Sequence, residues 1–136
     1  MNLVFDAIRF RRGAYTLTAD AVFSPGVHLI SGRTGTGKST LALAAAGLLA
    51  PDAGEIRYRD RCGAPLLLMQ FPEYQVTGTT VTEEIASWNV AGTEEPFALF
   101  KVTPSDRRDP LTISRGELRR LELACILART AELLIL

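Results

Sequence analysis

Residues 32–39 read GRTGTGKS, and the sequence on either side predicts a strand before this stretch and a helix after it. The segment Val27–Ser31 is short and apolar, which is typical of a buried strand. Residues 38–50 are rich in Ala and Leu and predict a helix that Pro51 ends. A strand, a glycine-rich loop and a helix in this order match the phosphate-loop pattern G-x-x-x-x-G-K-[ST]. The stretch therefore predicts an α/β fold built around a triphosphate site.

The chemistry of a triphosphate explains the residue types of this loop. Glycines permit positive φ and a close approach of backbone N–H donors to phosphate oxygens, and the N-terminus of the next helix adds partial positive charge. We expect Lys38 to act in catalysis by bridging the β- and γ-phosphates, and Ser39 to ligate Mg²⁺. The residues expected to contact ATP here are Gly32, Thr34, Gly35, Thr36, Gly37, Lys38, Ser39 and Thr40.

The composition argues against a nucleic-acid-binding, membrane-spanning or secreted protein. The 136 residues carry 15 basic and 15 acidic side chains, so no overall field attracts nucleic acid, and no nucleic-acid partner is expected. No apolar run reaches the roughly 18 residues that span a bilayer, and the first residues lack the features of a signal peptide. Cys62 and Cys125 have no metal-type spacing and are expected to be free thiols. These features predict a soluble, cytoplasmic protein.

The remaining segments complete an alternation of strands and helices. Residues 2–11 and 15–19 alternate apolar and polar side chains, with one slip in the first, and predict a hairpin. Four further segments are expected: an edge strand at 55–58, a strand at 65–70 buried on both faces, a helix at 83–88, and a buried strand at 133–136. A helix at 117–130 is predicted to begin with a capping box of Ser114 and Glu117. Trp88, Phe97, Leu99 and Phe100 are expected to pack the region between Pro72 and Pro110.

Three segments in this order resemble the ATP-binding subunits of ABC transporters. The phosphate loop is the first. Residues 69–76 read MQFPEYQV and are similar to the Q-loop of energy-coupling-factor importers of metals and vitamins. Residues 111–120 read LTISRGELRR and resemble the LSGGQ signature with its arginine-rich helix. Residues 133–136 resemble the strand that leads to the Walker B acids.

The resemblance implies the fold and its organisation. It implies an α/β P-loop NTPase of the ABC ATPase type, with an N-terminal antiparallel β part, a central parallel sheet and a small helical subdomain. Residues 1–136 then form a single, truncated ABC ATPase domain. Its expected parts are a nucleotide-binding core with P-loop and Q-loop at 1–72, the helical subdomain at 73–112, and the signature helix with the Walker B strand at 113–136.

The resemblance also implies site residues and partners. Gln70, at the end of a buried strand, is expected to act in catalysis and to ligate Mg²⁺ with Ser39. Ser114 and Gly116 are expected to face ATP held by a second ABC ATPase subunit, in a homo- or heterodimer. A transmembrane transporter subunit is expected to dock on residues 70–88, where residues 74–76 look exposed. The assembled protein would be peripheral at the inner face of the cell membrane.

Two positions depart from the family pattern. Arg115 replaces the first signature glycine, so its side chain must point away from phosphate or meet phosphate itself. By spacing, Arg12 occupies the position at which the family has an aromatic residue that stacks on adenine. Tyr15, Phe10 or an arginine stacked on the base are the alternatives at that position.

The acids expected after Leu136 are absent from the 136 residues. The sequence therefore predicts a fragment, an engineered truncation or a shortened gene that binds ATP and hydrolyses it negligibly. The leading function is the ATP-binding subunit of an importer for a metal ion or vitamin. The alternatives are a non-catalytic nucleotide-binding or regulatory module, and a small nucleotide kinase whose lid would use Arg107, Arg108 and Arg115.

Overall fold

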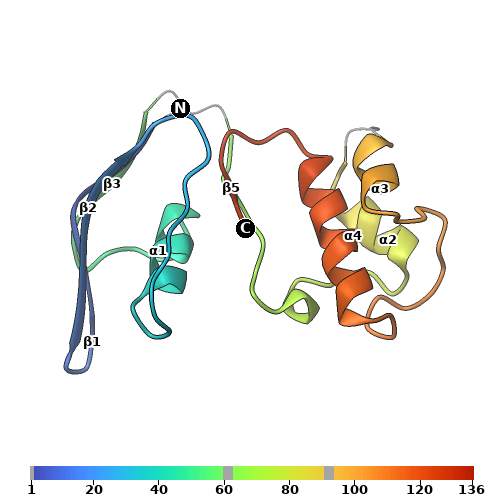
Figure 1. Ribbon diagram of the computed structural model, residues 1–136, viewed down its shortest axis with the longest axis horizontal. Helices are drawn as coiled ribbons and strands as arrows, with labels where there is room; N and C mark the ends of the chain where they lie inside the picture. Colours follow the sequence, from blue (N-terminus) through green and yellow to red (C-terminus); the bar gives the residue numbers. More distant parts are fainter. Residues whose placement is uncertain (1, 60–62, 91–93) are drawn as a thin grey trace. The chain divides into compact units, whose positions relative to one another are not determined.

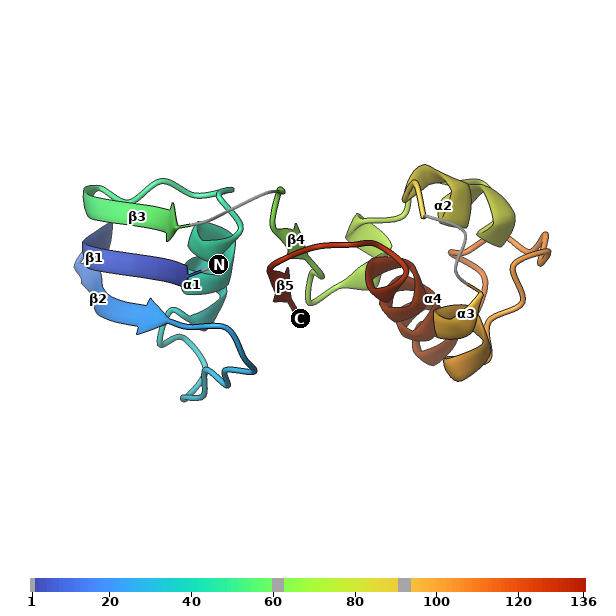
Figure 2. The ribbon, with the colours of Figure 1, turned by 90° about the horizontal axis from the view of Figure 1, so that it is seen from above.

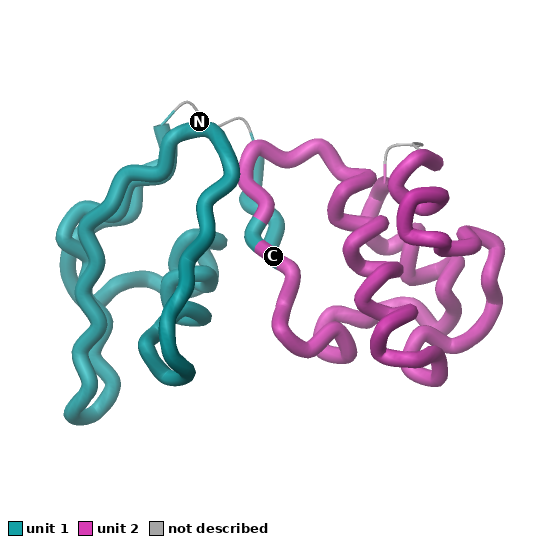
Figure 3. The backbone as a smooth tube through the Cα atoms, in the orientation of Figure 1, with its two compact units in different colours: residues 1–67, 135 teal, residues 68–134, 136 magenta. Residues whose placement is uncertain are grey.

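The computed structural model describes residues 2–59, 63–90 and 94–136, which form two compact units (Figure 3). The first unit contains the residues up to Leu67 together with Ile135, and the second contains residues 68–134 with Leu136. Cys62 lies outside the described residues, whereas Cys125 is a buried free thiol, as expected. In the described parts of the chain, no helix has the length and apolar character needed to cross a bilayer.

The first unit is built on a three-stranded antiparallel sheet. Its strands are β1 (Asn2–Arg12), β2 (Tyr15–Phe23) and β3 (Ala53–Arg59), in the order β2-β1-β3. The predicted hairpin and the predicted edge strand are both confirmed, and each strand is longer than the sequence pattern indicated.

A β-bulge in β1 explains the slip in its alternation. Leu3, Phe5, Ile8 and Phe10 are all buried, although Phe5 and Ile8 are three residues apart. The pairing register shifts between Phe5 and Ile8 against β2 and between Asp6 and Arg9 against β3, and Ala7 takes a φ of 46°. A bulge inserts one extra residue, and the apolar side chains after it therefore return to the core face.

The helix after the phosphate loop, α1 (Lys38–Ala45), lies against one face of this sheet (Figures 1 and 2). It is five residues shorter at its end than the 38–50 prediction. Gly47 takes a φ of 74°, and Leu48 N–H donates to the Leu43 carbonyl at 2.9 Å. This geometry is the Schellman stop, which glycine adopts without strain. Gly47 therefore ends the helix before Pro51 is reached.

The strand predicted at Val27–Ser31 is wrong, because these residues belong to neither described sheet. Val27 and Leu29 are 102% and 91% exposed. An apolar run becomes a strand only when a neighbouring strand takes its backbone hydrogen bonds, and no described strand pairs with this one. The predicted strands at 65–70 and 133–136 are both shorter than expected: β4 (Leu66–Leu67) and β5 (Leu134–Ile135) pair with each other as a two-stranded sheet of the described residues.

The second unit is helical. It contains a short 3₁₀ turn, η1 (Pro72–Tyr74), and the helices α2 (Val81–Ser87), α3 (Glu95–Leu99) and α4 (Arg115–Leu127). Thr80 caps α2 by accepting from Glu83 N–H. The capping box of Ser114 and Glu117 at the start of α4 is confirmed. The sequence pattern indicated neither η1 nor α3.

The apolar stripe of α4 packs against α2 and α3 to form the core of this unit (Figure 1). Leu118, Leu121 and Cys125 recur at helical spacing on that stripe, and all three are at most 4% exposed. Phe97 is buried as expected, and Trp88 packs against the same core. Leu99 is 71% exposed, so the expectation that it packs there is wrong.

Candidate phosphate loop and signature helix

The loop at residues 32–39 has the backbone that its glycines predict. Gly35 and Gly37 have φ values of 84° and 96°, and Gly32 has a φ of 156°. Only glycine adopts the first two without strain. Thr36 N–H and the Thr36 hydroxyl both face the Arg33 carbonyl, at 3.4 and 2.9 Å, which closes a turn inside the loop.

The Lys38 side chain folds back over this turn. Its ammonium group donates to the Gly32 carbonyl at 2.9 Å and to the Arg33 carbonyl at 2.8 Å. The cation therefore lies within the curve of the loop, where phosphate oxygens would compete with these two carbonyls for it. A mobile cation at this point suits the expected bridge between phosphate groups.

The first turn of α1 has the electrostatics of an anion site. Gly37 is its N-cap, without a side-chain cap, and the first turn contains no acidic residue. The N-terminal N–H groups and the helix dipole therefore face no neighbouring carboxylate in this turn. Ser39 is exposed and Thr40 is half-buried there. Thr34 is exposed within the loop itself.

Strand β2 braces the loop from the sheet. The Tyr15 hydroxyl donates to the Thr36 carbonyl at 2.9 Å. A Cβ atom added to Gly37 would lie only 2.7 Å from Leu17 Cδ2, which shows how closely the loop packs on this strand. The role of Leu17 was not predicted from the sequence. The alternation of β2 indicates that residues 15 and 17 share one face, but it does not indicate that this face contacts the phosphate loop.

Two of the three adenine candidates, Arg12 and Tyr15, lie side by side at the hairpin turn. Arg12 and Tyr15 are cross-strand partners in the β1–β2 register, and both are exposed. The Arg12 guanidinium donates to the adjacent Arg11 carbonyl at 2.8 Å. Phe10 is 2% exposed in the sheet core, so of the three residues considered for base stacking it is the one whose ring is covered.

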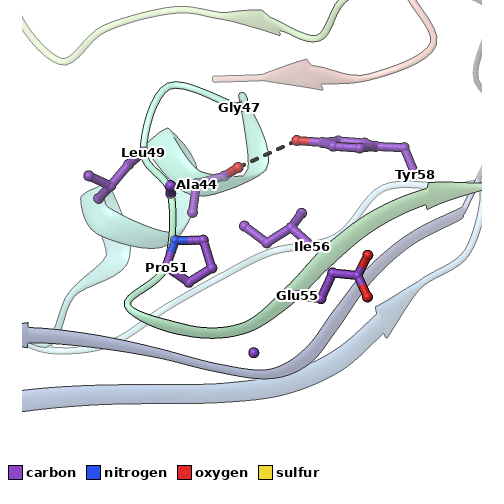
Figure 4. Close-up of a pocket in the computed structure, with 9 residues that line it drawn as sticks. Ala44, Gly47, Leu49, Pro51, Glu55, Ile56 and Tyr58 are labelled. Atoms are coloured by element: carbon purple, nitrogen blue, oxygen red, sulfur yellow. Dashed lines mark hydrogen bonds between the residues drawn. The ribbon is translucent and has the colours of Figure 1, made fainter.

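A cavity of about 340 Å³ lies elsewhere in the first unit (Figure 4). It opens between the C-terminal end of α1 and β3, beside Pro51, Ile56 and Tyr58, whose hydroxyl donates to the Ala45 carbonyl at 3.0 Å. Glu55 and the negative end of the helix dipole border it, which is the wrong charge for a triphosphate. The phosphate loop, at the other end of α1, remains the nucleotide candidate.

The signature segment forms the N-terminus of α4 in the second unit. Ser114 N–H and the Ser114 hydroxyl donate to Glu117 Oε2 at 3.0 and 2.7 Å. Glu117 N–H donates back to Ser114 Oγ at 3.2 Å. Gly116 has open space around its Cα, since an added Cβ would meet nothing within 4 Å. Gln70 lies exposed in the same unit, before η1.

An arginine holds the capping carboxylate in place. Arg108 donates to Glu117 Oε1 from both terminal nitrogens at 3.2 Å, and to Asp106 Oδ2 at 2.7 Å. The hydrogen bonds from Ser114, followed by those from Arg108, hold the pKa of Glu117 below its usual range. This network keeps the first turn of α4 capped and leaves Arg108 engaged with two carboxylates.

The arginine that replaces the signature glycine points to the Q-loop segment. Arg115 Nη2 donates to Glu73 Oε1 at 2.7 Å, and one turn later Arg119 Nη1 donates to the Met69 carbonyl at 2.7 Å. The backbone N–H of Glu73, then Arg115, hold the pKa of that carboxyl below its usual range. The i, i+4 spacing of the two arginines indicates one helix face, but the sequence did not reveal their partners.

Two buried carboxyls near α4 were not anticipated. Glu84 is 1% exposed and accepts from Thr77 N–H, Gly78 N–H and the Trp88 indole, each at 2.7 Å. Glu122 is 2% exposed, its Oε2 accepts from Arg119 at 3.2 Å, and its Oε1 has no partner. Burial raises the pKa of Glu122 to about 7, against the lowering effect of Arg119. Burial also raises the pKa of the Cys125 thiol to about 12.

Comparison with known proteins decides the family. The family model described as ABC transporter matches residues 22–136, most of the chain. The chain belongs to the ABC transporter family. Membership of this family implies nucleotide binding, and it confirms the resemblance that the sequence shows.

Curated relatives of this ABC transporter chain include ATP-binding proteins of energy-coupling factor transporters. EcfA1 of Thermotoga maritima is 32% identical over 156 residues, covering all of this chain and 60% of that protein. EcfA1 of Staphylococcus saprophyticus is 31% identical over 127 residues, covering 79% of this chain and 47% of that protein. The chain therefore spans about half to three fifths of the length of these relatives.

Solved structures confirm the fold class. The chain superposes on cbiO1 of Clostridium perfringens, described as part of the ABC transporter complex cbiONQ, with a TM-score of 0.64 at 16% identity. That match covers 93% of this chain and 61% of the other. A bacterial ABC transporter cassette solved as a dimer gives a TM-score of 0.62 at 17% identity, covering 94% and 69%. The ABC cassette fold, with its antiparallel sheet, parallel strand pair and helices, is therefore the fold of this chain.

Proposed function

We propose that this chain binds MgATP at residues 32–39 and serves as the ATP-binding part of an importer for a metal ion or vitamin. The observation that carries the proposal is the geometry of the loop. Two glycines at positive φ expose backbone N–H groups, Lys38 lies within the curve, and the uncapped N-terminus of α1 follows directly. These are the groups that a triphosphate requires.

The residues present suit Mg²⁺ held jointly with the nucleotide. Mg²⁺ in such sites takes one or two protein oxygens and completes its shell with phosphate oxygens and water. The exposed Ser39 hydroxyl, in the first turn of α1, supplies one such oxygen. The metal role of Gln70, which lies in the second unit, stays a prediction from the sequence. When bound, the ion would neutralise charge that develops on the phosphates. Lys38 would hold the β- and γ-phosphates, and the loop N–H groups would fix their position.

A calorimetric titration tests the phosphate site. Lys38→Ala removes the ammonium group without adding bulk, and we expect it to weaken MgATP binding at least tenfold, that is by about 1.4 kcal/mol or more. Arg129→Ala is the matched control, because it removes an exposed cation from the second unit, just after α4. Equal affinity of the Lys38 variant and the parent protein would reject the loop as the triphosphate site.

We further propose a second ATPase subunit as partner, with Ser114 and Gly116 facing its nucleotide. The position of Gly116 supports this, because it leaves space at the start of α4 for a close approach of phosphate. A kinase lid is not favoured. Arg108 and Arg115 already donate to Glu117, Asp106 and Glu73, whereas a lid requires arginines that are free to reach phosphate.

A transmembrane subunit is proposed to dock on the segment that follows Gln70. Phe71 and Tyr74 are 42% and 74% exposed, and their rings lie 5.6 Å apart. Val76, which looked exposed in the sequence, packs against the helical core, so Tyr74 is the better position for a probe. A crosslinker on Tyr74→Cys should capture a membrane subunit in native membranes. Capture of soluble proteins alone would contradict this partner.

A further inference from the structure

We propose that Tyr15 is a positioning residue of the phosphate loop, whose hydroxyl fixes the peptide between Thr36 and Gly37. The inference rests on the proposed function, since it assigns Tyr15 a role at the same triphosphate site. It differs from the adenine-stacking role considered for Tyr15, because the group that acts is the hydroxyl and the group it acts on is loop backbone.

The hydrogen bond sets the direction of a phosphate donor. Tyr15 is the first residue of β2, and its hydroxyl donates to the Thr36 carbonyl at 2.9 Å. A trans peptide is planar, so the carbonyl oxygen of Thr36 and the N–H of Gly37 point in opposite directions. Holding the carbonyl toward Tyr15 therefore directs the Gly37 N–H away from the strand.

Leu17 fixes the same peptide by contact. Side chains two apart on a strand share a face, so Tyr15 and Leu17 approach the loop together. A Cβ on Gly37 would lie 2.7 Å from Leu17 Cδ2 and 3.1 Å from Leu17 Cδ1, distances that leave no room for one. The Gly37 peptide is thus bounded by an apolar contact from Leu17 and tied by the Tyr15 hydroxyl. Gly37 alone, at a φ of 96°, would have many other orientations open to it.

The role predicts an effect that does not depend on the base. A misdirected Gly37 N–H weakens the binding of the phosphate groups, whether or not a nucleoside is attached to the triphosphate. Loss of a stacking ring, by contrast, weakens nucleotides and leaves inorganic tripolyphosphate unaffected. The two roles therefore separate when ligands with and without a base are compared.

The test uses the full chain and three ligands with Mg²⁺: ATP, GTP and inorganic tripolyphosphate. Tyr15→Phe removes only the hydroxyl, and we expect affinity for all three to fall by the same factor, about fivefold, as for one neutral hydrogen bond. Tyr15→Leu removes the ring as well and is expected to show the same factor. Tyr58→Phe is the matched control, because it removes a tyrosine hydroxyl that donates to a backbone carbonyl at the other end of α1, and it should leave all three affinities unchanged.

The outcomes separate the inference from the proposed function. Absence of binding of any of the three ligands to the parent chain would reject the triphosphate site itself. Binding by the parent with unchanged affinities in Tyr15→Phe would overturn the positioning role. A loss in Tyr15→Leu that is confined to ATP and GTP would overturn it in favour of base stacking. If Tyr15→Leu fails to fold in a thermal melt, the comparison of Tyr15→Phe with the parent still decides.

Discussion

Replacing Glu122 with Gln is expected to stabilise the helical unit at neutral and alkaline pH. The carboxyl is 2% exposed, one of its oxygens has no partner, and its pKa is raised from 4.5 to about 7. The first cause is burial, which disfavours the charged form, and the carboxylates of Glu84 and Glu73 add to it. Arg119, which also donates to the Met69 carbonyl, offsets part of this cost.

The sign and size follow from proton linkage. Below pH 4.5, Glu122 is protonated in both the folded and the unfolded chain, so its ionisation costs nothing. Between pH 4.5 and about 7 the unfolded chain ionises while the folded chain keeps its proton, and stability falls as pH rises. Each pKa unit corresponds to about 1.4 kcal/mol, so the loss approaches about 3 kcal/mol above pH 7. Glutamine does not ionise and escapes this loss.

Urea unfolding followed by tryptophan fluorescence measures the effect. Trp88 is the only tryptophan, and it packs against the core of the helical unit, so it reports on that unit. We expect the two proteins to have similar unfolding free energies at pH 4.5, and Glu122→Gln to gain steadily up to pH 8. Glu94→Gln, at an exposed carboxyl, should show no such gain. A difference between Glu122→Gln and the parent that stays constant with pH would refute the reasoning.

Two further substitutions test the loop and the helix cap. Gly37→Ala should lower MgATP affinity at least tenfold in calorimetry, because the added Cβ would meet Leu17 and the backbone φ is 96°. Gly63→Ala is the control and should leave the affinity unchanged, because its Cβ would meet nothing within 4 Å. Equal affinities of Gly37→Ala and the parent would show that the loop tolerates the change. Ser114→Ala removes the N-cap of α4 and should lower the unfolding free energy of the helical unit by about 1 kcal/mol, with Ser105→Ala, at an exposed turn, as the control in the same fluorescence assay.

The sequence by itself determined the features that depend on neighbouring residues. The phosphate loop, the β1–β2 hairpin and the capping box of Ser114 and Glu117 each involve groups only a few positions apart. Their glycines, alternation and cap spacing therefore indicate them without knowledge of the fold. The positions of Lys38 and Gly37 in the loop follow in the same way, and the structure shows the backbone that they predict.

The tertiary structure decided what depends on distant segments. Val27–Ser31 is apolar, yet it forms no strand, because strand formation requires a partner that the run itself does not specify. The Tyr15 hydroxyl reaches Thr36 across 21 positions, and Arg119 reaches Met69 across 50. The raised pKa of Glu122 arises from burial, which other helices impose on α4. Contacts of this kind depend on which surfaces meet when the chain packs, and local pattern does not contain that information.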